Sequence, residues 1–138
     1  MSFDKRYIFL LSNAHKSLQR YLDRQIEASQ LSAVQAGVLF VLEKQQGLLI
    51  GELAQRLNLA PSAMTGLADR MIKLKLISRQ VDAQDKRSQR VYLTDQGLQA
   101  SKQAQQLLVP INQQLTKGFS AEEMQVVSRW LQHIQRNF

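Results

Sequence analysis

The chain has 138 residues and no recognisable signal peptide or membrane span, so we expect one compact, cytoplasmic domain with a hydrophobic core. Its net charge of +7, from 18 Lys and Arg against 11 Asp and Glu, favours nucleic acid or an anionic membrane surface as a partner, unless the charge only keeps the protein soluble. The absence of cysteine excludes disulfides, thiolate nucleophiles, thiolate metal sites and thiol redox sensing.

Apolar residues at helical spacing predict two helices in the first third of the chain. The first is expected over residues 5–28, where apolar residues recur in steps of four and three at Tyr7, Leu11, Ala14, Leu18 and Tyr21. The second is expected over residues 32–45. It begins at a capping box, in which the Ser32 hydroxyl accepts a bond from a first-turn amide and the Gln35 side chain reaches back, and it ends before Gly47.

Two shorter helices are expected close together, separated by a turn at residues 58–60. The first covers residues 50–57 and the second residues 61–74, and each has an apolar side with helical spacing. Pro61 occupies the first position of the second helix, where the amide hydrogen that proline lacks would have had no helical partner.

The hydrophobic period then changes from about 3.6 residues to about 2, which predicts a β-hairpin. Its strands are expected over residues 77–82 and 88–93, with Ile77 and Val81 on one side of the first strand. The polar residues 83–87 between the strands would form a mobile, charged tip.

The remaining residues predict two more helices. Thr94 caps a long helix over residues 95–117, which Pro110 is expected to kink because its ring removes one backbone hydrogen bond. Ser120 and Glu123 form a second capping box. The last helix then shows apolar residues in steps of three and four at Met124, Val127, Leu131, Ile134 and Phe138.

Basic residues are concentrated over the pair of short helices and the hairpin. Between Arg56 and Arg90 lie eight basic residues against three acidic ones, although any one of them alone is read as an ordinary solvated charge. A helix about 10–12 Å across fits the major groove of DNA, and a two-stranded hairpin beside it reaches phosphates or the adjacent minor groove. The combination is typical of a winged helix-turn-helix protein, in which the hairpin is the wing.

Three segments of this region resemble the MarR family of bacterial transcription regulators: residues 51–57, residues 61–70 and, most specifically, the wing with the Leu-Thr-x-x-Gly sequence after it, residues 82–97. The flanking long helices match as well, so the resemblance covers essentially the whole chain. It implies a mostly α-helical fold with a small β-hairpin, a winged helix-turn-helix flanked by N- and C-terminal dimerisation helices.

The resemblance also implies how the chain is divided. Residues 1–138 would form a single MarR-type domain. Within it, residues 30–95 would be the winged DNA-binding lobe, and residues 1–29 and 96–138 would be the dimerisation helices.

The same resemblance assigns residues to DNA. The helix over residues 61–74 would enter the major groove, Arg70 and Lys73 would meet phosphates, and Arg87 would enter the minor groove. Asp69 and Asp85 would support the wing by holding its arginines through charge-assisted hydrogen bonds. The expected DNA-binding residues are Ser32, Pro61, Ser62, Ala63, Thr65, Gly66, Arg70, Lys73, Lys86, Arg87 and Arg90.

Simpler interpretations of some of these residues stay open. Ser62 and Thr65 are also ordinary polar residues for the first turn of a helix, and Asp85 is also an ordinary turn aspartate. Two residues depart from the family pattern: Gly66 stands where a large, frequently basic residue is common, and Lys75 stands where a helix-ending glycine is common. Which bases are read is therefore open.

The resemblance further implies a homodimer and a small-molecule effector. The residues expected in the dimer interface are Tyr7, Leu11, Leu18, Leu115, Val127, Leu131 and Ile134, and the alternative is that the outer helices only pack on each other within one chain. The residues proposed for an effector pocket are Tyr7, Leu11, His15, Phe40, Leu108 and Ile111, for which ordinary core packing is the alternative.

These observations favour a sequence-specific regulator of transcription, a repressor by family habit, that binds double-stranded DNA as a homodimer on a pseudo-palindromic site. The alternative is a winged helix that docks an acidic protein, which the small Gly66 would suit. An enzyme is not expected, because the sequence shows no nucleophile paired with a base and no glycine-rich phosphate loop. No cofactor, metal or membrane partner is expected, since His15 and His133 lie far apart and lack nearby carboxylates.

Overall fold

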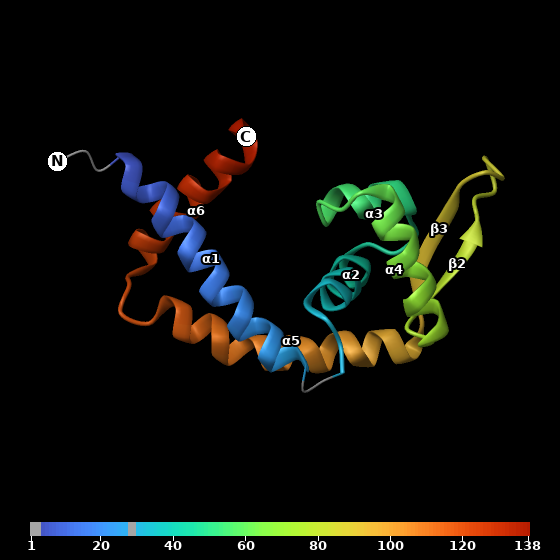
Figure 1. Cartoon of the computed structure of the whole chain (residues 1–138). Helices are drawn as coiled ribbons and strands as arrows, with labels where there is room; N and C mark the ends of the chain where they lie inside the picture. Colours follow the sequence, from blue (N-terminus) through green and yellow to red (C-terminus); the bar gives the residue numbers. More distant parts are fainter. Residues whose placement is uncertain (1–3, 28–29) are drawn as a thin grey trace. The chain divides into compact units, whose positions relative to one another are not determined.

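A computed structural model describes residues 4–27 and 30–138 of the chain (Figure 1). Its elements, in chain order, are α1 (Asp4–Glu27), α2 (Ala33–Lys44), β1 (Leu48–Leu49), α3 (Ile50–Arg56), α4 (Pro61–Lys73), β2 (Ile77–Val81), β3 (Gln89–Leu93), α5 (Asp95–Thr116) and α6 (Ala121–Asn137). The chain forms two compact units, Met1–Gln105 and Gln106–Phe138, and α5 contributes to both.

The helices and the hairpin predicted from the sequence are all present in the described part of the chain. Their ends differ from the predicted ends by at most one residue, except that the predicted end of the first helix, residue 28, lies outside the described residues. Both predicted capping boxes are confirmed: the hydroxyls of Ser32 and Ser120 each accept a bond from the amide three residues later, at 3.1 Å. Thr94 likewise accepts a bond from the amide of Gly97 at 3.0 Å.

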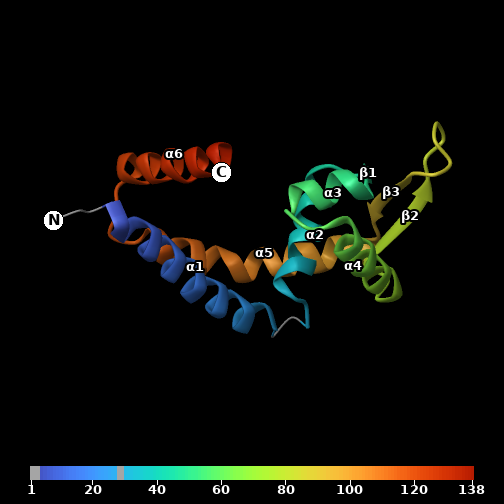
Figure 2. The same cartoon turned by 45° about the horizontal axis from the view of Figure 1, so that its top comes forward.

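The hairpin belongs to a three-stranded antiparallel sheet in the order β1-β3-β2. Leu48 lies opposite Val91, and Ile77 lies opposite Leu93. The sequence did not predict β1, because a strand of two residues shows no alternation. Ile77 is buried as expected, whereas Val81 is 57% exposed, because β2 and β3 extend away from the helices of this unit toward the tip (Figure 2).

The core of the first unit joins α2, α3, α4 and the sheet. Apolar residues spaced for one side of each helix point inward, which is the arrangement that removes most apolar surface from water. The fully or nearly fully buried members are Val38, Leu39, Leu42, Leu48, Leu53, Ala54, Met64, Leu67, Ala68, Met71, Ile77 and Val91.

The connection from the wing into α5 explains the Leu-Thr-x-x-Gly sequence. A Cβ atom on Gly97 would lie 1.9 Å from the carbonyl oxygen of Leu76, so only glycine fits this crossing. The Thr94 hydroxyl donates to the carbonyl of Lys75 at 2.6 Å. Lys75 itself has a φ of 62°, the left-handed conformation for which a helix-ending glycine is usually preferred.

A polar contact joins α2 to the first half of α5. The fully buried Ser101 donates its hydroxyl hydrogen to Glu43 at 2.5 Å, and Gln105 donates to the same carboxylate oxygen. The buried hydroxyl thereby has the hydrogen-bond partner that burial demands. This contact fixes the first half of α5 against α2 in the winged lobe, residues 30–95.

The second unit contains the end of α5 and the whole of α6. The helix α5 continues past Pro110, so the proline does not end it, and the predicted kink stays a prediction. The helix α6 has no buried residue, although Val126, Val127 and Leu131 give it an apolar side. No helix among residues 4–27 and 30–138 is long and apolar enough to cross a membrane.

Candidate nucleic-acid interface

The helix α4 is anchored on one side and exposed on the other. Its buried residues, Met64, Leu67, Ala68 and Met71, recur at intervals of three and four and hold it in the core. The residues predicted to meet DNA lie on the remaining surface. Pro61, Ser62, Ala63, Thr65, Arg70 and Lys73 are exposed, and Gly66 is half-buried.

The N-terminus of α4 has no side-chain cap. Its N-cap residue is Ala60, and Pro61 follows at the first helical position. The helices α2 and α6, by contrast, are capped by Ser32 and Ser120. The open end of α4 therefore presents first-turn amides and the positive end of the helix dipole, which is the usual environment for a phosphate.

The tip of the wing is a turn in which Asp85 accepts several hydrogen bonds, and the predicted mobility of the tip stays a prediction. One carboxylate oxygen accepts hydrogen bonds from the backbone amide of Arg87 at 3.0 Å and from its Nε at 3.4 Å, and the other accepts from the Ser88 hydroxyl at 3.3 Å. The bond from the Arg87 amide is the largest influence that lowers the pKa of Asp85 below its ordinary value of 3.8. The side chain of Arg87 is 93% exposed, so its cationic group extends into solvent at the tip.

An ion pair joins the wing to α4. Arg79 on β2 donates to Asp69 on α4 at 2.8 Å, with side chains 38% and 46% exposed. The sequence prediction named Asp69 for this role without naming its partner. Alternation along β2 places Arg79 on the same side of the strand as the buried Ile77, and α4 supplies the carboxylate that pairs with it there.

Arg90 has partners inside the winged lobe. Its Nε donates to Asp82 at 3.1 Å, and its Nη1 donates to the carbonyl of Gly47 at 2.7 Å. These bonds connect the base of the wing to the turn that follows α2. A DNA contact by Arg90 stays a prediction, and the observed bonds give the residue a structural role that the sequence analysis missed.

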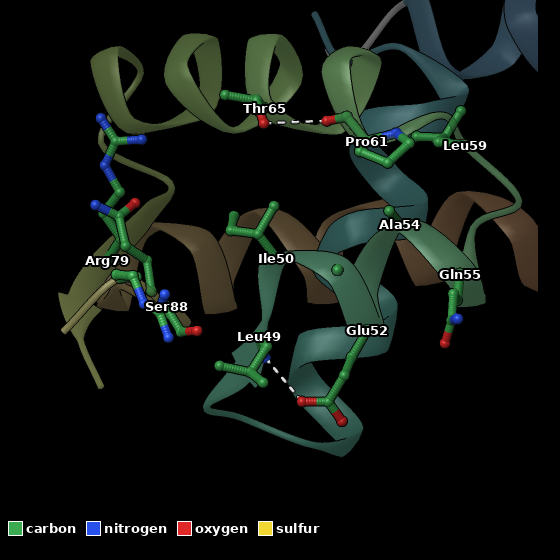
Figure 3. A pocket seen from close by; sticks show the side chains of 13 residues that line it. Leu49, Ile50, Glu52, Ala54, Gln55, Leu59, Pro61, Thr65, Arg79 and Ser88 are labelled. Atoms are coloured by element: carbon green, nitrogen blue, oxygen red, sulfur yellow. Dashed lines mark hydrogen bonds between the residues drawn. The ribbon is translucent and has the colours of Figure 1, made fainter. Parts of the chain in front are cut away.

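A groove of about 770 Å³ lies between the start of α3, the start of α4 and the wing. Figure 3 shows Thr65 and Pro61 on one side of it, Leu49 and Glu52 on the opposite side, and the wing residue Arg79 at one end. Arg87 also lines the groove. Of the residues predicted separately for the helix and the wing, Pro61, Thr65 and Arg87 therefore border one continuous concave surface.

The other predicted site residues do not line this groove. Ser32 caps α2, and Lys86 is exposed at the tip of the wing. The predicted effector-pocket residues divide between the two units, with Tyr7, Leu11, His15 and Phe40 in the first and Leu108 and Ile111 in the second. The predicted dimerisation residues also divide, with Tyr7, Leu11 and Leu18 in the first unit and Leu115, Val127, Leu131 and Ile134 in the second. Both sets stay predictions.

No cluster able to hold a metal ion was found in the described part of the chain. Two acidic residues at the interface have basic partners. Asp69 pairs with Arg79, and Asp82 pairs with Arg90.

A helix-turn-helix followed at once by a two-stranded wing defines a winged helix-turn-helix protein. Residues 29–88 of the chain match the family model described as "MarR family". The fold is that of MarR-family transcriptional regulators.

Comparison with known proteins gives the following relatives. The HTH-type transcriptional repressor MdtR of Bacillus subtilis (strain 168) is 34% identical over 95 residues, a match that covers 64% of this chain and only 61% of that protein. The S. aureus MepR–DNA complex has a TM-score of 0.88 at 25% identity and covers 96% of this chain and 98% of that one. A putative MarR-like regulator from Bacillus cereus ATCC 10987 has a TM-score of 0.83 at 25% identity, with 99% of both chains covered.

Proposed function

We propose that the protein is a transcription regulator, without a catalytic role, that binds double-stranded DNA sequence-specifically as a homodimer. The observation that carries this proposal is the joint surface of α4 and the wing. The ion pair between Asp69 and Arg79 links the two, and Arg87 extends from the wing with 93% of its side chain exposed. Because helix and wing are linked, they can engage one duplex together.

The known relatives support DNA as the partner. The MepR structure is described as a complex with DNA, and MdtR is described as a transcriptional repressor. The charge of this chain agrees, since basic residues predominate over the helix pair and wing and the net charge is +7. Repression is therefore the sign of regulation that we propose.

We propose the following roles for the residues of this surface. The exposed side of α4 enters the major groove, and the uncapped amides at its start contact a phosphate, with Ser62 beside them. Arg70 and Lys73 contact phosphates further along the helix, while Lys86 and Arg87 reach the minor groove from the wing. We assign Arg90 to hold the base of the wing in place, because its guanidinium already bonds to Asp82 and Gly47.

Dimerisation is supported by the apolar residues that the outer helices leave exposed. Ile8 and Phe9 on α1 are 71% and 66% exposed, and Val127 and Leu131 on α6 are 39% and 38% exposed. A second copy of the chain would cover such surface and would present two α4 helices to a pseudo-palindromic site, with half-sites about 34–36 Å apart. A small molecule that binds one form of the dimer more tightly than the other would change the affinity for DNA by the ratio of its two affinities. We include such an effector in the proposal.

The test begins with selection of bound duplexes from a random pool, followed by titration of a selected duplex at two salt concentrations. Affinity should fall steeply with salt because phosphate contacts release counterions. Equal affinity for every duplex, or a flat salt response, would refute the proposal. Absence of duplex binding together with capture of an acidic protein would favour the protein-docking alternative.

Replacing Arg87 tests the wing directly. We expect Arg87→Ala to weaken binding of the selected duplex by at least about 1 kcal/mol, as expected for loss of a specific contact. Lys102→Ala is the control, because Lys102 is an exposed basic residue on α5 outside the predicted DNA contacts. An effect no larger than that of the control would remove Arg87 from the interface.

A further inference from the structure

The outer surface of α4 is unusually poor in long side chains at its N-terminal half. Ala63 and Thr65 are exposed there, and the next residue is the half-buried Gly66. We define these three residues as the small-residue patch. Arg70 and Lys73 follow at least one helical turn further along, and the Arg70 guanidinium extends back to 3.7 Å from the Cβ position of Gly66.

The hydroxyl of Thr65 is already engaged. Its Oγ1 donates to the carbonyl oxygen of Pro61 at 3.0 Å, within the same helix (Figure 3). A threonine hydroxyl has only one hydrogen to donate, so this bond leaves none for an acceptor on a base. What Thr65 offers outward is its methyl group and an acceptor lone pair.

The fold does not require glycine at position 66. A Cβ atom built there would have Arg70 Nη1 as its nearest neighbour, at 3.7 Å, which is ordinary van der Waals contact. Gly97 differs, because the same atom there would overlap a backbone carbonyl at 1.9 Å. The absence of a side chain at Gly66 therefore has no packing cause, and it leaves a space beside Thr65 that the end of the Arg70 side chain borders.

Helices read bases in the major groove by hydrogen bonds from basic, amide, acidic or hydroxyl side chains and by apolar contact. Bidentate recognition of purines needs Arg, Lys, Asn or Gln; the small-residue patch itself contains none of them, and Arg70 borders it at Gly66. Apolar recognition matches the 5-methyl group of thymine to Ala or to the methyl of Thr. We propose that the small-residue patch selects half-sites by contact with thymine 5-methyl groups. This inference rests on the proposed DNA-binding function and specifies how the bases are read.

The first experiment alters the DNA and leaves the protein intact. In a duplex selected from the random pool, each thymine of a half-site is replaced in turn by deoxyuridine, which pairs identically but lacks the methyl group. In a parallel series each purine is replaced by its 7-deaza analogue, which lacks the major-groove N7 acceptor. We expect about a fourfold loss of affinity at a contacted thymine, the value of one buried methyl-sized group, and smaller losses across the 7-deaza series.

The second experiment locates the contact on the protein with a matched pair of variants. Thr65→Ser keeps the hydroxyl and removes the methyl, whereas Thr65→Val removes the hydroxyl and keeps the methyl. The measured quantity is the ratio of affinities for the thymine and deoxyuridine duplexes. Thr65→Ser should reduce this ratio toward one at the thymine that Thr65 contacts, whereas Thr65→Val should leave the ratio unchanged. The comparison is a double-mutant cycle, which isolates the coupling between the methyl group of residue 65 and the methyl group of the thymine.

The outcomes separate this inference from the function on which it rests. Failure to select any duplex would refute the DNA-binding proposal itself. Tight, salt-dependent binding that is insensitive to deoxyuridine, or that is lost chiefly with 7-deazapurines, would overturn methyl recognition and leave the regulator intact. The duplex series decides the matter with the native chain even if a Thr65 variant fails to fold.

Discussion

The winged lobe and the helix α6 acquire their structure in different ways. The lobe surrounds its own core, in which residues such as Leu53 and Met71 are 0% exposed. The helix α6 buries no residue and depends on local signals, the Ser120 capping box above all. The lobe therefore has the interactions to be stable by itself, whereas α6 retains an apolar side that only an additional surface would cover.

The largest expected effect comes from deleting core volume in the lobe. Leu53→Ala should lower the free energy of unfolding by about 2–5 kcal/mol, because the cavity is only partly refilled. Leu131→Ala makes the same chemical change on α6, where the side chain is 38% exposed, and should have less than half the effect. Denaturant unfolding of both variants measures the difference, and equal losses would contradict the contrast between the two regions.

A pair of glycines separates fold from function within the lobe. Gly97→Ala should lower the free energy of unfolding by about 1–3 kcal/mol, because the new methyl group overlaps the Leu76 carbonyl and the backbone must move. Gly66→Ala should raise it by about 0.5–1 kcal/mol, since alanine is the better helix former and has space there. Thermal unfolding of both variants gives the two signs. Destabilisation by Gly66→Ala would show a packing role for this glycine.

The sequence predicted the elements with a strong period or a cap, and it predicted poorly what depends on long-range contact. The Ser32 and Ser120 capping boxes and the change of period at Ile77 were sufficient to locate α2, α6 and the hairpin. The strand β1 was missed because two residues have no pattern. The bond from Arg90 to Gly47 was missed because its partners lie 43 positions apart, and no local rule connects them.

The candidate site shows the same division. The resemblance named Asp69 as a support for the wing, but the side chain that it holds, Arg79, comes from the fold. The role of Gly97 is similar, because its sequence neighbours do not reveal that Leu76 crosses beside it. How the predicted dimer and effector residues of the two units come together stays a prediction for the same reason.

A charge on the apolar side of α6 tests whether a second copy covers it. Leu131→Asp should weaken self-association at least tenfold, or by about 1.4 kcal/mol, because the carboxylate would lose its hydration in an interface. Gln132→Asp adds the same charge at an adjacent exposed position and should have the smaller effect. Sedimentation velocity over a range of concentrations measures both. A native chain that stays monomeric at every concentration would contradict the dimer.

The smallest expected effect concerns two exposed carboxylates, one in each region. Asp85 at the wing tip and Glu123 at the start of α6 both have lowered pKa values, each caused first by a backbone hydrogen bond, from Arg87 and Ser120 respectively. A carboxyl whose pKa is lower in the folded state stabilises that state above its unfolded pKa. This contribution disappears as the pH falls through the folded pKa. Acidification below the ordinary values of 3.8 and 4.5 should therefore loosen both turns locally.

An NMR titration can follow the amide of Arg87 as a reporter of the wing and the amide of Ser120 as a reporter of α6. Each resonance should shift with a midpoint below the ordinary pKa of its acceptor carboxyl, because protonation removes the charge that accepts the bond. Asp85→Asn should abolish the shift at Arg87 and leave that at Ser120, since the two caps share no partner. A shift at Arg87 that persists in this variant would mean that the wing tip is organised by another group, and the exposed position of Arg87 would then need a different cause.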